Sequence, residues 1–138
     1  MATILCIDDK EQVLELHRAV LESNGYRVLT AIDALTGITL ARTESTDVVV
    51  LDFNMPGMDG NEVAEMMLKQ HPSVAVVICS DYPDQIPEPL RWFADALVRK
   101  DDSPKALLSA LARLVKPGAA QMKMAIQRIT GAKERLSA

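Results

Sequence analysis

Short, mostly apolar runs alternate along this chain with longer segments in which apolar residues recur at helical spacing. The apolar runs occupy residues 3–8, 26–31, 47–51, 74–79 and 95–98. Strands of this length that are separated by helices are typical of parallel βαβ units with right-handed crossovers. The alternation therefore predicts an α/β fold, with a doubly wound, open parallel sheet of five strands flanked by helices.

The predicted helices follow four of these runs and occupy residues 10–23, 34–42, 61–70 and 104–115. Gly25 follows the first helix, where a left-handed residue commonly ends a helix. Asp33 is a candidate N-cap for the second helix, and Pro104 opens the last helix at a position that proline favours. The central runs are continuously apolar over Val48–Leu51 and Val74–Cys79, which indicates that helices cover both faces of the sheet.

The size and composition of the chain fit one globular domain, since 49% of its 138 residues are apolar and 25% are charged. The longest apolar run, Val74–Cys79, is far shorter than the roughly 20 residues of a membrane span. The N-terminus also lacks the basic region of a secretory signal. We therefore expect a cytoplasmic protein without a membrane partner. Cys6 and Cys79 are expected to be buried, reduced thiols, with a regulatory disulfide as the alternative.

Charge is distributed unevenly along the chain. Residues 1–115 carry a balance of −8, whereas residues 116–138 carry a balance of +4. The acidic body argues against direct nucleic-acid binding. Lys116-Pro117-Gly118 divides a domain over residues 1–116 from a basic amphipathic segment over residues 117–138. Two interpretations remain open for this segment: an extra C-terminal helix or linker on its own domain, and a helix that docks a partner or a second copy.

Acidic side chains follow two of the predicted strands at the point where each strand ends. Asp8 and Asp9 follow the first strand, and Asp52 follows the third. In open α/β sheets, ligands bind at the carboxyl ends of strands, and in the order 2-1-3-4-5 these two strands are neighbours about 4.8 Å apart. Each acid alone also fits a helix cap or a turn residue. Two carboxylates about 5 Å apart, however, repel by about 3 kcal/mol at an effective dielectric constant near 20, so the cluster calls for a cation.

The donors at these strand ends are all oxygens, which favours a hard divalent ion, Mg²⁺ or Mn²⁺. Ser80 follows the fourth run and Lys100 the fifth. Singly, Ser80 fits a helix cap and Lys100 a surface charge. Together with the acids they supply the hydroxyl and ammonium that a phosphoryl group on Asp52 needs around its oxygens, which predicts a phosphoacceptor site with Asp52 as nucleophile.

At this point the chain resembles the response-regulator receiver domain of two-component signalling, a CheY-like family. The resemblance covers about residues 2–116 and is carried by Ile4-Leu5-Cys6-Ile7-Asp8-Asp9, Leu51-Asp52-Phe53-Asn54-Met55-Pro56-Gly57-Met58-Asp59-Gly60, Ser80 and Lys100. It implies a flavodoxin-like sheet in the order 2-1-3-4-5. It also implies a phosphorelay signalling function with no turnover of an external substrate, and therefore not an enzyme.

The resemblance further implies a role for each matching residue. Asp52 is the expected phosphoacceptor and takes phosphate from a sensor histidine kinase or a histidine phosphotransfer protein. Ser80 resembles the hydroxyl switch residue, and Lys100 the phosphate-binding lysine. The implied Mg²⁺ ligands are Asp8 (directly or through water), Asp9, Asp52 and the backbone carbonyl of Asn54.

Three features depart from the family pattern. The family usually has Lys-Pro where this chain has Lys100-Asp101, and an aromatic switch residue where it has Leu97. The third feature is a proline-rich segment before the fifth run, which predicts a fourth helix that is short, displaced or absent; its prolines are Pro83, Pro87 and Pro89. These changes fall on the face through which receivers usually dimerise or signal, where an unidentified downstream protein or a homodimer is the expected partner.

A second hypothesis is therefore a phosphorylation-independent protein-interaction module with a receiver fold and a degenerate output face. The complete set of acids, hydroxyl and lysine argues against it. A phosphatase of the haloacid-dehalogenase type needs a second acid two residues after its nucleophile, where this chain has Asn54. His17 and His71 are interpreted as structural or surface residues. Because no output domain follows residue 138, we expect a stand-alone regulator, a phosphorelay intermediate or a fragment of a larger protein.

Overall fold

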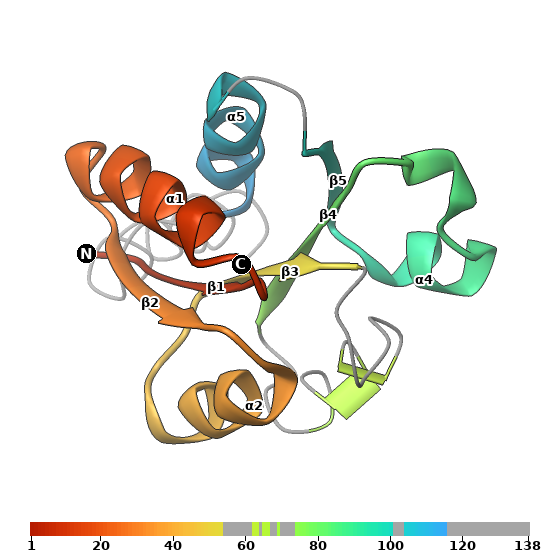
Figure 1. Cartoon of the computed structure of the whole chain (residues 1–138), viewed down its shortest axis with the longest axis horizontal. Coiled ribbons are helices and arrows are strands. Elements are labelled where there is room, and N and C mark those ends of the chain that lie inside the picture. The colour runs from red at the N-terminus through yellow and green to blue at the C-terminus, as the bar shows by residue number, and fades with distance from the viewer. Residues whose placement is uncertain (54–61, 64, 67–68, 70–73, 101–103, 116–138) are drawn as a thin grey trace, which may run out of the picture.

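The computed structural model describes residues 1–53, 62–63, 65–66, 69, 74–100 and 104–115. Five parallel strands form one sheet in the order β2-β1-β3-β4-β5 (Figure 1). The strands are β1 (Thr3–Ile7), β2 (Arg27–Ala31), β3 (Val48–Asp52), β4 (Ala75–Ser80) and β5 (Ala96–Arg99). Both the α/β architecture and the strand order predicted above are confirmed.

Helices cover both faces of this sheet. They are α1 (Glu11–Ser23), α2 (Ala34–Thr43), the 3₁₀ turn η1 (Pro83–Gln85), α4 (Glu88–Phe93) and α5 (Pro104–Leu114). Helices α1 and α5 lie on one face and α2 on the other (Figure 1). The described residues of the helix predicted over residues 61–70 are helical; they are Glu62, Val63, Glu65, Met66 and Lys69. None of the described helices is long and apolar enough to cross a lipid bilayer.

Two apolar clusters, one on each face, explain why the central strands are apolar throughout. In β1, Leu5 and Ile7 pack into the cluster under α2 and α4, whereas Ile4 and Cys6 pack into the cluster under α1 and α5. All five residues of β3 are buried. A strand with helices on both faces has no solvent-facing side, so its sequence shows no alternation.

The two cysteines are free and buried, as predicted. Cys6 on β1 and Cys79 on β4 belong to the same cluster, but β3 lies between their strands. Burial raises the pKa of each thiol to about 12, so both thiols are protonated at neutral pH. The structure therefore keeps them as small apolar side chains and not as a disulfide.

Local sequence signals place the helix ends. Gly25 has a φ of 88°, the left-handed conformation expected at this position. The backbone N–H of Thr36 donates to Asp33 Oδ1 at 2.7 Å, which confirms Asp33 as the N-cap of α2. Helix α4 has six residues and begins directly after Pro87, so the prediction of a short fourth helix is confirmed.

The extra helix predicted over residues 117–138 lies outside the described residues, as do Asn54 and Asp101. The division at residue 116 stays a prediction for the same reason.

Candidate functional site

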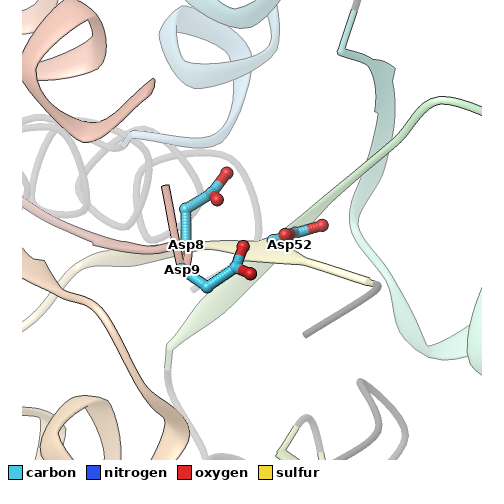
Figure 2. A group of neighbouring side chains, drawn as sticks. All are labelled: Asp8, Asp9 and Asp52. Atoms are coloured by element: carbon cyan, nitrogen blue, oxygen red, sulfur yellow. The ribbon is translucent and has the colours of Figure 1, made fainter. Parts of the chain in front are cut away.

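The carboxyl ends of β1 and β3 bring three acidic side chains together. The two strands pair in parallel, with Ile7 opposite Leu51. Asp52 is therefore the last residue of β3, beside the point where Asp8 and Asp9 leave β1. One carboxylate oxygen from each acid lies within 4.8 Å of the others, and Figure 2 shows the three side chains gathered at this end of the sheet.

The three acids differ in exposure. Asp8 and Asp52 are 3% and 2% exposed, whereas Asp9 is exposed. Asp8 also accepts a hydrogen bond at Oδ1 from the backbone N–H of Lys10, at 2.9 Å. Lys10 is the N-cap of α1 and caps no N–H with its side chain. The interpretation of Asp9 as a helix cap is therefore not supported, because the side chain that accepts a hydrogen bond from the backbone at this turn is that of Asp8.

Among the described residues, Lys100 is the cationic side chain that forms ion pairs with these acids. Its Nζ lies 2.8 Å from Asp52 Oδ1 and 3.6 Å from Asp8 Oδ2. Burial alone would lower the pKa of Lys100, but the hydrogen bond to Asp52 and the charges of Asp52 and Asp8 outweigh it and raise the pKa above its usual range. Lys100 is therefore fully charged at neutral pH.

The backbone at the end of β4 positions Lys100. Ser80 pairs with Arg99 in the β4–β5 ladder, and the Lys100 N–H donates to the Ser80 carbonyl at 3.1 Å. The Ser80 side chain is 1% exposed, and its Oγ accepts the Tyr82 N–H at 3.0 Å. The hydroxyl thus shapes the turn after β4, and a hydroxyl that accepts one bond still has a hydrogen to donate.

The electrostatics of the cluster favour a further cation. Burial raises the pKa of Asp8 above its usual value; the Lys10 N–H opposes this rise, and the charge of Asp52 adds to it. Three carboxylates beside one ammonium leave a formal charge of −2. Their donor atoms are all oxygens, which suits Mg²⁺ and similar hard divalent ions. The residues present thus fit a divalent cation.

Sequence reasoning missed one neighbour of the site. His17 on α1 lines a cavity of about 120 Å³ together with Lys100 and Cys79. Burial lowers the pKa of His17 below its usual range, and the charge of Lys100 lowers it further. The helical spacing placed His17 near the apolar stripe of α1, but no local signal linked it to a lysine at the end of β5.

Comparisons with known proteins point to one family. The family model of the response regulator receiver domain matches residues 4–112. Protein PilH of Pseudomonas aeruginosa is 36% identical over 78 residues, which cover 56% of this chain. The chain spans 64% of the length of PilH and less than half of the length of the other curated relatives compared with it.

Solved structures show the same fold. Response regulator protein TrrA from Thermotoga maritima, in complex with Mg²⁺–BeF, is 28% identical with a TM-score of 0.78, and the match covers 83% of this chain and 100% of TrrA. A chain of the complex between histidine kinase ThkA and TrrA is also 28% identical, with a TM-score of 0.77; this match covers 84% of this chain and 100% of that one.

Proposed function

The chain belongs to the response regulator receiver domain family, and from this premise we propose that Asp52 accepts a phosphoryl group from the phosphohistidine of a sensor histidine kinase or a histidine phosphotransfer protein. One observation carries the proposal. The Asp52 carboxylate ends β3 inside a cluster of three acids, with the Lys100 ammonium 2.8 Å away. This pairing of a buried carboxylate with a fixed cation suits a nucleophile toward phosphorus.

The reaction exchanges one bond for another at phosphorus. A carboxylate oxygen of Asp52 attacks, an O–P bond forms, and the P–N bond to the donor imidazole breaks. The electron pair of that bond returns to the imidazole nitrogen, which takes up a proton. Lys100 would move its contact from the Asp52 carboxylate to the phosphoryl oxygens, and the Ser80 hydroxyl would donate to one of them.

Mg²⁺ (or Mn²⁺) fits the acidic cluster, and we propose Asp9 and Asp52 as its ligands, with Asp8 acting directly or through water. The backbone carbonyl of Asn54 stays a predicted ligand from the sequence. The ion would neutralise the charge that gathers between the carboxylates and an incoming phosphoryl group. The Mg²⁺–BeF complex of TrrA supports this assignment, since that protein shares the fold.

The complex of ThkA with TrrA supports a histidine kinase as the phosphodonor. We place the exchange in the cytoplasm, where free thiols such as Cys6 and Cys79 stay reduced. No external substrate is turned over in this scheme. The phosphorylated chain would act on a downstream protein through a change in its surface.

Intact-mass spectrometry tests the proposal directly. The full chain is incubated with Mg²⁺ and acetyl phosphate or phosphoramidate, beside Asp52→Ala and the matched control Asp84→Ala, whose side chain is exposed on η1. The wild type and D84A should each gain one phosphate that hydroxylamine removes, as expected of an acyl phosphate, and D52A should gain none. An adduct that persists in D52A would contradict the proposal.

The phosphorylation-independent interaction module remains the second candidate, because Leu97 stands at the aromatic switch position. Leu97 is half-buried and packs against the cluster that contains Ile86 and Leu90. Leucine has no aromatic ring, so this position cannot signal by moving a ring between buried and exposed positions. No adduct with either phosphodonor, in a chain that binds Mg²⁺, would favour this second candidate.

A further inference from the structure

The most exposed aromatic side chain of the described residues lies on α4, outside the acidic cluster. Trp92, the single tryptophan of the chain, is 84% exposed on α4. It lines a surface groove of about 730 Å³ with Asp84, Ile86, Glu88 and Arg91. Tryptophan is on average highly buried, so an exposed indole beside a groove makes this surface a candidate binding site.

The groove lies in an acidic part of the surface. Residues 81–95 carry four acidic side chains against Arg91 alone. Two of these acids, Asp84 and Glu88, line the groove itself. An apolar ring beside carboxylates suits a segment that carries apolar and basic residues, because basic side chains pair with the acids and also stack on an indole face.

Residues 116–138 have that composition. Their charge balance is +4, against −8 for residues 1–115. Their apolar residues recur at a spacing of about 3.5 positions; they are Met122, Ala125, Ile126, Ile129, Ala132 and Leu136. The charge of the segment and that of the groove are therefore complementary.

The position of the end of α5, after which the basic segment begins, also favours this segment as the occupant of the groove. Leu114 and Val115, at the end of α5, pack against the cluster that contains Ala96, the first residue of the edge strand β5. Helix α4 ends at Phe93, just before β5 begins. Helix α5, from which the basic segment continues, and the turn η1, whose Asp84 lines the groove, both contact β5. Residues 117–138 would reach about 33 Å even if fully helical.

We propose that the groove at Trp92 is the docking site of the chain's own basic segment, residues 117–138. In this arrangement Lys123 and Arg128 would lie opposite the carboxylates of Asp84 and Glu88, and the apolar residues of the segment would cover the Trp92 ring. A tethered segment has a high effective concentration at its own groove, which favours this occupant over a second copy. The segment would then cover α4 until a partner displaces it, whether or not Asp52 is phosphorylated.

The single tryptophan makes its own fluorescence the readout, in the full chain. Trp92 should emit at shorter wavelength and resist acrylamide quenching more than an 84% exposed indole would. Lys123→Glu with Arg128→Glu should shift the emission to longer wavelength and raise the quenching constant. The matched control, Arg42→Glu with Lys105→Glu, makes the same change in net charge at two exposed positions on α2 and α5 and should leave both values unchanged.

Charge exchange across the two surfaces makes the test specific. Asp84→Lys with Glu88→Lys should expose Trp92 as the segment variant does, and the combined four-residue variant should restore its protection. A wild-type ring that is quenched as readily as in the segment variant would overturn the proposal. Protection that grows with protein concentration, together with a dimer mass, would overturn it in favour of a second copy.

Discussion

Lys100 Nζ lies 2.8 Å from Asp52 Oδ1, and this contact ties the end of β5 to the end of β3 across the intervening strand β4. The same ammonium is 3.6 Å from Asp8 Oδ2. One lysine therefore serves two buried carboxylates that come from different strands. This sharing explains how the metal-free chain tolerates an acidic cluster at the edge of its core.

Removal of the shared ammonium should destabilise the metal-free protein. Lys100→Met removes the ammonium that pairs with Asp8 and Asp52, which we expect to lower the free energy of unfolding by about 2 kcal/mol. Urea unfolding in EDTA at pH 7 measures the loss. In the double variant with Asp52→Asn the loss should be smaller than the sum of the two single effects. Additive effects would show that the two side chains are not coupled.

Replacement of Asp52 should have a different result. Asp52→Asn removes one of three clustered carboxylates and leaves Lys100 paired with Asp8, so the metal-free variant should be as stable as the wild type or more stable. Asp33→Ala is the contrast, because it removes an N-cap and should cost about 1 kcal/mol. Thermal unfolding in EDTA compares the two. A clear fall in Tm for D52N would refute the electrostatic account of the cluster.

Mg²⁺ should stabilise the folded chain by mass action. At ten times the dissociation constant, a ligand that binds only the folded state adds about 1.4 kcal/mol. Asp9 is exposed, so Asp9→Ala should change the metal-free Tm little but should reduce its rise in Mg²⁺. Differential scanning fluorimetry with increasing MgCl₂ measures both. Equal rises in the two proteins would mean that Asp9 is not a ligand.

His17 should make the stability depend on pH in the mildly acidic range. Burial and the charge of Lys100 lower the pKa of His17 in the folded state, whereas an unfolded histidine titrates near 6.5. The unfolded chain therefore binds more protons as the pH falls below about 6.5, and stability is lost until the folded pKa is reached. His17→Gln should lose less stability than the wild type between pH 7 and pH 5 in urea unfolding. Parallel pH profiles for the two proteins would rule out this role.

Gly25 should resist substitution for a purely backbone reason. Its φ is +88°, and a Cβ built at this position meets no atom within 4 Å. Gly25→Ala should therefore cost about 1 kcal/mol through conformational strain alone. Gly25→Asn should cost less, because asparagine tolerates the left-handed region better. Equal Tm values for G25A and the wild type would show that the turn after α1 adapts to a side chain.

Much of the fold could be predicted because its signals are local. Asp33 caps α2 through a bond to the residue three positions on, and the apolar runs needed only their own composition to be identified as strands. Asp8 and Asp52 were found at strand ends because parallel strands all finish at one edge of the sheet. The local signals also predicted the short fourth helix, since proline restricts its own φ and the residue before it.

Residue types and their spacing were thus enough to predict the sheet, the ends of the described helices and the gathering of three acids at one edge. Three features could not be predicted in this way: Lys100 forms ion pairs with both Asp52 and Asp8, His17 lines a cavity with Lys100, and Trp92 is exposed beside an acidic groove. Each of these facts is a distance or an exposure set by packing between segments far apart in the chain. Residue type and spacing determine the conformational preferences of residues that are close in sequence. Contacts between side chains from distant segments, and the burial of those side chains, arise only when the whole core has formed.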